Sequence, residues 1–163
     1  MSELDRMISR FVTQRACLDF AFEQLSDVPG AVLEVGLGKA RTFDHIRERL
    51  GARALYAFDF EVHAPKRLVP AEEALFLGDF RETLRHAKTK LGRSAALVHA
   101  DIGSRDRAAD AILATEIAPM IGALLVPGGM VITDREMSDA GWAPLALPEG
   151  VSGDWPYFMY RAA

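Results

Sequence analysis

The chain has 163 residues, of which 50% are hydrophobic and 26% are charged, and its formal net charge is −4. This length and balance predict one globular domain with its own hydrophobic core, and the negative net charge argues against a general nucleic-acid binder. The single cysteine, Cys17, excludes an internal disulfide, and the apolar stretches are too short for a membrane span or a signal core, so we expect a soluble cytoplasmic protein.

Helical and strand-like segments alternate along the chain. In chain order, apolar spacing and turn residues predict a helix over 4–25, a strand over 31–35, a helix over 42–50, strands over 54–58 and 74–77, a helix over 80–91, a strand over 95–100, a helix over 105–125, a strand over 130–133, and two weaker strands over 142–147 and 157–161. Pro65 and Pro70 allow only a loop or one helical turn over 61–70, and Pro127-Gly128-Gly129 predicts a turn. Short, continuously apolar strands between helices are typical of an α/β fold whose parallel sheet is covered on both faces.

We expect residues 1–163 to form a single domain. It would consist of an N-terminal helix over 1–28, a core over 30–134 and C-terminal strands over 135–163. Ligands bind such sheets at the carboxyl ends of the strands, near the point where the strand order reverses. The glycine and polar residues that follow the first four strands are therefore the candidate functional residues.

The first strand is followed by a glycine-rich turn, Glu34-Val-Gly36-Leu-Gly38-Lys-Ala40. A phosphate-binding Walker loop ends in Gly-Lys-Ser/Thr. Here Gly38-Lys39 is followed by Ala40, and the spacing of the motif is also wrong. A nicotinamide-dinucleotide site needs a third glycine, and Arg41 occupies that position. S-adenosylmethionine has no phosphate and needs no third glycine, and its amine and sulfonium carry positive charges that suit the carboxylate of Glu34. Of the three ligands, the sequence of this turn therefore favours S-adenosylmethionine.

Acidic residues also follow the second and third strands. Asp59 stands about twenty residues after the glycines, where a carboxylate can accept hydrogen bonds from both hydroxyls of a ribose; Glu61 is a second candidate for this role. Since dinucleotides and S-adenosylmethionine both contain ribose, Asp59 does not discriminate between them. After the third strand, Asp79 can accept from the exocyclic amine of adenine, and the ring of Phe80 can pack on the base.

Four segments together resemble the successive motifs of class I S-adenosylmethionine-dependent methyltransferases. They are LEVGLG at 33–38, YAFD at 56–59, GDF at 78–80 and VHADIG at 98–103. The resemblance implies a Rossmann-like three-layer αβα sandwich with a mostly parallel sheet, shortened at the C-terminal end, and S-adenosylmethionine as cofactor. The cofactor-binding residues that it implies are Glu34, Gly36, Leu37, Gly38, Asp59, Phe60, Gly78, Asp79, Phe80 and His99. The carboxylates that follow the first three strands would converge on one cleft.

The resemblance also places His99 and Asp101, which stand at the end of the fourth strand and just after it, near the sulfonium and the acceptor. They are the candidate catalytic residues, as a general base and the group that orients it. The alternative is structural: a histidine bonded to backbone and an aspartate that caps the following helix. Some O-methyltransferases of this class hold a divalent metal near these positions, but Arg135 stands where a neutral polar ligand would be expected, so no metal is predicted.

The predicted activity is methyl transfer from S-adenosylmethionine to a small-molecule acceptor. We expect no nucleic-acid partner and no membrane association, and a homo-oligomer is left open. The N-terminal helix and the segment 61–70 are expected to form the lid. Two alternatives remain: a protein that binds S-adenosylmethionine without transferring its methyl group, and a nicotinamide-dependent oxidoreductase, which Glu34 and Arg41 disfavour.

Overall fold

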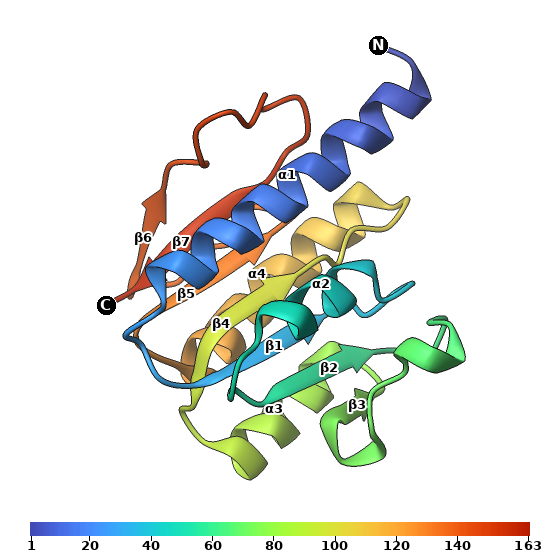
Figure 1. The fold of residues 1–163 in the computed structure, drawn as a ribbon. Coiled ribbons are helices and arrows are strands. Elements are labelled where there is room, and N and C mark those ends of the chain that lie inside the picture. Colours follow the sequence, from blue (N-terminus) through green and yellow to red (C-terminus); the bar gives the residue numbers. More distant parts are fainter.

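The computed structural model describes residues 1–163 as alternating helices and strands (Figure 1). The α-helices are α1 (Glu3–Gln24), α2 (Arg41–Arg49), α3 (Phe80–Leu91) and α4 (Arg107–Leu124). The strands are β1 (Ala31–Val35), β2 (Leu55–Asp59), β3 (Leu75–Leu77), β4 (Ala95–Ala100), β5 (Leu125–Thr133), β6 (Trp142–Leu145) and β7 (Phe158–Ala162). Two short 3₁₀ turns, η1 (Lys66–Leu68) and η2 (Glu72–Ala74), replace a helix between β2 and β3.

The seven strands form one sheet in the order β3-β2-β1-β4-β5-β7-β6. Strands β1 to β5 run parallel, whereas β7 lies antiparallel to both β5 and β6. The order reverses between β1 and β4, which is where ligands bind in open α/β sheets. The predicted Rossmann-like fold with a mostly parallel sheet is confirmed.

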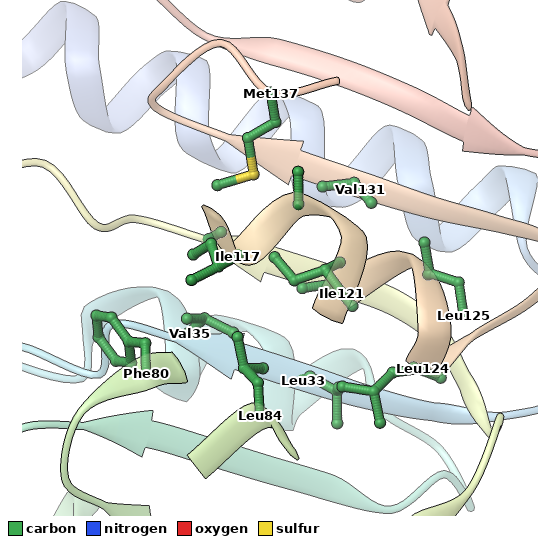
Figure 2. Close-up of a cluster of buried hydrophobic side chains, with 14 of the residues drawn as sticks. Leu33, Val35, Phe80, Leu84, Ile117, Ile121, Leu124, Leu125, Val131 and Met137 are labelled. Carbon is green, nitrogen blue, oxygen red and sulfur yellow. The ribbon is translucent and has the colours of Figure 1, made fainter. Parts of the chain in front are cut away.

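Helices cover both faces of the sheet and make it the middle of three layers (Figure 1). On one face, α3 and α4 pack on the strands in a cluster that includes Leu33, Leu84 and Ile121 (Figure 2). On the other face, α1 packs through Leu18 and its neighbours onto the central strands. Strands β1 and β4 are buried at every residue, and their sequences are apolar except for Glu34 and His99.

Several helix ends follow from local hydrogen bonding. The hydroxyl of Ser2 accepts from the backbone N–H of Asp5, whose carboxylate in turn accepts from the Ser2 N–H, and this capping box begins α1. Asp79 caps α3 by accepting from the N–H of Arg81 at 2.8 Å. Gly92 ends α3 with a positive φ of 68°, a conformation that glycine adopts without strain.

The structure corrects one strand boundary. Pro127-Gly128-Gly129 was expected to form a turn before a strand at 130–133, but these residues lie inside β5, which begins at Leu125. The pairing of β4 with β5 shifts register between Ala95 and Leu97, so the irregularity is absorbed as a bulge. The C-terminal end is shortened as expected, since no helix separates β5, β6 and β7. No helix has both the length and the apolar character needed to cross a membrane.

Candidate cofactor and acceptor site

Strand register brings the predicted residues to one edge of the sheet. Val35 of β1 pairs with Phe58 of β2 and with Ala100 of β4, and Ala100 pairs with Thr133 of β5. The residues that follow these strands therefore leave the sheet side by side. They border a cleft of about 610 Å³, a volume in the range of small-molecule sites.

The glycine turn forms one wall of the cleft. Gly36 has a φ of +96°, and a Cβ at this position would collide with the carbonyl oxygen of Asp101, so only glycine fits. Gly38 has a φ of +51° with open space beside it. Its N–H donates to Asp59 Oδ2 at 2.8 Å, while the N–H of Phe60 donates to Oδ1 at 2.7 Å. Asp59 thus joins the β1 turn to the β2 turn at the cleft.

Two aromatic rings line another part of the cleft. Phe60 and Phe80 both line it, with their ring centres 4.8 Å apart and their planes tilted by 57°. Asp79 and Gly78 do not line the cleft. The carboxylate of Asp79 instead caps α3 and pairs with the guanidinium of Arg81 at 3.1 Å, and Arg81 itself faces the cleft.

Glu34 and His99 occupy a different place from the one expected. Both side chains are completely buried and lie outside the lining of the cleft. Glu34 Oε1 accepts a hydrogen bond from the hydroxyl of Thr42, and Oε2 lies 2.7 Å from Nδ1 of His99. The other ring nitrogen of His99 lies 2.5 Å from the hydroxyl of Tyr157. The expected position of these two residues in the cleft wall is corrected, because their polar atoms are satisfied beneath it.

The buried pair is electrostatically coupled. Burial disfavours a charged imidazole, but the Glu34 carboxylate, together with the charges of Asp101 and Asp134, outweighs this effect and raises the pKa of His99 above its usual value. Burial also raises the pKa of the Tyr157 hydroxyl well above its usual range.

Asp101 lies in the cleft, held by residues from the far end of the sequence. Its Oδ2 accepts from Arg10 Nη2 at 2.6 Å and from Gln14 Nε2 at 2.8 Å, both on α1, while its Oδ1 is buried without a hydrogen-bond partner. The expectation that Asp101 might instead cap the next helix is wrong, since Asp106 caps α4. His99 and Asp101 do not hydrogen-bond to each other.

Asp134 follows β5 and lies beside Asp101. Its two oxygens accept from the backbone N–H groups of Ile102 and Gly103, each at 3.0 Å, and it pairs with Arg135 at 3.0 Å. Burial, followed by the nearby Asp101 carboxylate, raises the pKa of Asp134 to about 6. The two carboxyl groups form a pair at the ends of β4 and β5.

The sequence predicted two segments that complete the cleft, but it did not identify the individual side chains that they contribute. Arg10, Phe11 and Gln14 of α1 line it, as does His63 of the 61–70 segment, so both segments expected to form a lid contribute to the wall. The signal was present in α1, where polar Arg10 and Gln14 stand four residues apart and so share a helix face. Arg41, whose guanidinium lies 5.3 Å from the ring centre of Phe11, also lines the cleft.

A Rossmann-like domain whose glycine turn and β2 carboxylate share one cleft defines a protein that binds an adenosine-containing cofactor. The sequence over residues 1–162 matches the model of a family described as S-adenosyl-L-methionine methyltransferase, and the chain belongs to this family. The cofactor of this family is S-adenosylmethionine.

Solved structures support this assignment. An S-adenosyl-L-methionine methyl transferase from Silicibacter pomeroyi DSS-3 is 38% identical, with a TM-score of 0.93 and coverage of 100% of this chain and 99% of that chain. TrmN from Thermus thermophilus is 19% identical (TM-score 0.59, 90% of this chain and 48% of that chain), and MycE of the mycinamycin pathway, in complex with Mg and SAH, is 15% identical (TM-score 0.54, 99% and 49%). At such low identity the last two share the fold alone. No curated protein matches the chain.

Proposed function

We propose that this protein transfers the methyl group of S-adenosylmethionine to a small-molecule acceptor, as an enzyme and not only as a binding protein. The proposal rests on one observation, which is that two different groups of residues line the same cleft. The glycine turn, Asp59 and two phenylalanine rings border one part, and residues that follow β4, including Asp101, border another. A single cavity of about 610 Å³ thus offers room for the cofactor and for access by a second molecule.

The residues present fit this cofactor. Gly36 has no room for a Cβ, and the open space beside Gly38 lets a ligand approach the turn closely. Asp59 would hold the ribose hydroxyls, in preference to Glu61, which is not part of the cleft lining. Phe60 and Phe80 would pack on the adenine, as offset aromatic groups do.

When bound, S-adenosylmethionine supplies a methyl group on a positively charged sulfur, which is already a strong electrophile. The task of the protein is then to hold the acceptor in line with that methyl group, and positioning of this kind lowers a barrier by about 7–11 kcal/mol. Asp101 lines the cleft and is held in place by Arg10 and Gln14. This carboxylate would take the proton from an acceptor atom that must lose one.

A small acceptor agrees with the shape and charge of the molecule. Three side chains of α1, those of Arg10, Phe11 and Gln14, line the cleft and so limit the space left for an acceptor. The net charge of −4 disfavours a long polyanion, because nucleic-acid binders depend on extended basic surfaces.

Binding and turnover test the proposal separately. Calorimetry with S-adenosylmethionine and S-adenosylhomocysteine should show binding, with none for NAD. Asp59→Ala should weaken binding at least tenfold, or about 1.4 kcal/mol, while the matched change Glu61→Ala should leave it unaltered. Equal affinity in both variants would remove Asp59 from the site.

Turnover is measured with S-adenosylmethionine and a panel of small molecules that carry hydroxyl, amine, thiol or carboxylate groups. Acceptor-dependent formation of S-adenosylhomocysteine, detected by mass spectrometry together with the methylated product, is the expected result. Tight cofactor binding without product from any member of a broad panel would favour the alternative, a protein that only binds S-adenosylmethionine.

A further inference from the structure

A second cavity adjoins the cleft at the ends of β4 and β5. It has a volume of about 360 Å³ and shares Arg10, Gly103 and Ser104 with the cleft. The first turns of α1, the start of α4, the residues that follow β5 and the segment 154–158 at the start of β7 complete its walls. Gly103 permits the close packing at this shared wall, because a Cβ there would collide with the side chains of Asp134 and Arg135. A molecule in the second cavity would therefore lie directly beside the cofactor cleft.

Four guanidinium groups from three separate segments line this cavity. Arg6 and Arg10 come from α1, Arg107 begins α4, and Arg135 follows β5. Asp101 pairs with Arg10, and Asp110 pairs with Arg135. Arg6 and Arg107 are exposed and form no ion pair.

The acidic side chains around the cavity do not neutralise these two arginines. Asp134 is buried and already accepts from two backbone N–H groups and from Arg135. Glu136 and Asp154 are exposed and form no ion pair with any of the arginines. Arg10 and Arg135 are therefore already engaged by carboxylates, whereas the guanidinium groups of Arg6 and Arg107 remain free for a ligand.

Two buried N–H donors at this cavity also have no acceptor. They are Nε of Arg10 and Nε1 of Trp155, and the Arg10 guanidinium lies 5.4 Å from the centre of the Trp155 ring. Buried donors are nearly always hydrogen-bonded in folded proteins. Both residues line the cavity, so a ligand group rich in acceptor oxygens would lie next to these two donors.

We propose that the second cavity binds an anionic group, a carboxylate or a phosphate, of the small-molecule methyl acceptor. The rest of the acceptor would extend past Gly103 and Ser104 into the cleft. This assignment rests on the proposed function of the cleft for its role in catalysis. Guanidinium groups suit both anions, because their planar array of N–H groups matches carboxylate and phosphate oxygens.

The two tryptophans of the chain provide a direct test. Each indole N–H of the ¹⁵N-labelled protein, saturated with S-adenosylhomocysteine, gives one resonance, and Trp155→Phe assigns that of Trp155. The protein is titrated with inorganic phosphate and, separately, with acetate, and chloride keeps the ionic strength constant. The expected result is a saturable shift of the Trp155 resonance with at least one of the two anions, while Trp142 on β6 does not respond. The anion that binds more tightly distinguishes a phosphate from a carboxylate site.

Variants separate the site from general electrostatics. The double change Arg6→Gln and Arg107→Gln removes two exposed side chains and should weaken anion binding at least tenfold. Arg85→Gln, which removes an exposed arginine from α3, should leave it unchanged. Shifts that do not saturate, or equal binding by both variants, would overturn the proposal.

Two other outcomes of these experiments would lead to different conclusions. Tighter binding of a ten-nucleotide RNA than of phosphate, with the same Trp155 shift, would replace the small molecule by a nucleic acid. Failure of S-adenosylhomocysteine to bind would overturn the proposed function and the acceptor role with it, whereas the phosphate isotherm would still show whether the cavity is an anion site.

Discussion

The carboxylate of Glu34 and the imidazole of His99 are both completely buried, and they lie 2.7 Å apart. Their register explains the contact, because Glu34 and His99 are paired residues on the adjacent strands β1 and β4. Through Thr42 and Tyr157 the pair also connects the start of α2 to the C-terminal segment. Each group depends on the other, since a polar or ionised group that is buried without a partner is strongly unfavourable.

We predict that Glu34→Ala lowers the free energy of unfolding by about 3–5 kcal/mol, because it leaves a buried histidine without its counter-ion. Tyr157→Phe, which removes one hydroxyl and keeps the ring, should cost less, about 1–3 kcal/mol, because it leaves one ring nitrogen of His99 without a partner. Urea unfolding monitored by circular dichroism compares the two variants. Similar losses in both would show that the pair adds nothing beyond an ordinary hydrogen bond.

Asp134 predicts a pH dependence of stability. Its pKa in the folded protein is raised from 3.8 to about 6 by burial and by the Asp101 carboxylate. A folded state that holds a proton more tightly is favoured at low pH. This contribution is complete below pH 3.8 and is lost as the pH rises through 6. The change corresponds to about 3 kcal/mol over that window.

Asp134→Asn isolates this effect from other titrations. Between pH 4 and pH 7 the wild-type protein should lose about 2.4 kcal/mol relative to the variant, measured by urea unfolding at each pH. A second variant, Asp101→Asn, removes the neighbouring charge and should lower the pKa of Asp134, observed through its carboxyl ¹³C resonance. Parallel stability curves for wild type and Asp134→Asn would contradict the raised pKa.

At the level of single residues, the sequence allowed Gly36, Asp59, Phe60, Phe80 and Asp101 to be placed at the cleft, because each follows a strand whose end could be recognised. It could not show which direction each side chain takes. Glu34 and His99 lie within strands, where successive side chains point to opposite faces of the sheet, and their side chains meet each other beneath the cleft. Asp79 is drawn to the N-terminus of α3, where a carboxylate is also favoured by the helix dipole.

Between elements, the turn that follows β1 depends on close packing against the turn that follows β4. Gly36→Ala should lower the free energy of unfolding by more than about 3 kcal/mol, because the strain of a positive φ adds to a collision with the Asp101 carbonyl. Gly51→Ala is the matched control, since Gly51 has a φ of +60° and no atom near its added Cβ. The control should cost about 1–2 kcal/mol. Thermal unfolding of both variants measures the difference, and equal losses would mean that backbone strain alone matters at Gly36.

Element boundaries followed from the sequence where local chemistry decides them. Strands β1 and β4 and helix α3 begin and end where apolar runs, Asp79 and Gly92 indicate. The early start of β5 could not be predicted, because Pro-Gly-Gly normally forms a turn. The bulge between β4 and β5 keeps these residues in the strand, which is a tertiary effect.

At the scale of the whole molecule, the parts of the site that the sequence did not reveal are those formed by distant segments. Arg10 and Gln14 reach Asp101 across about ninety residues because α1 lies along the sheet (Figure 1). The second cavity likewise needs α1, α4 and the segment before β7 to meet. Such contacts depend on how helices pack on the sheet, and a pattern of hydrophobic residues does not specify that geometry.

The C-terminal strands are predicted to be essential for folding although no helix lies between them and β5. Strand β7 pairs along β5, and Tyr157, Met159 and Tyr160 fill the two main clusters of the core. Burial of each such side chain contributes about 1.5–3 kcal/mol, so their joint loss approaches the 5–15 kcal/mol that stabilises a typical domain. A chain that ends at residue 137 should therefore show no cooperative thermal unfolding in calorimetry. Deletion of residues 1–8, the mostly exposed start of α1, should preserve the transition, and a cooperative transition in the 1–137 fragment would show that the terminal strands are peripheral.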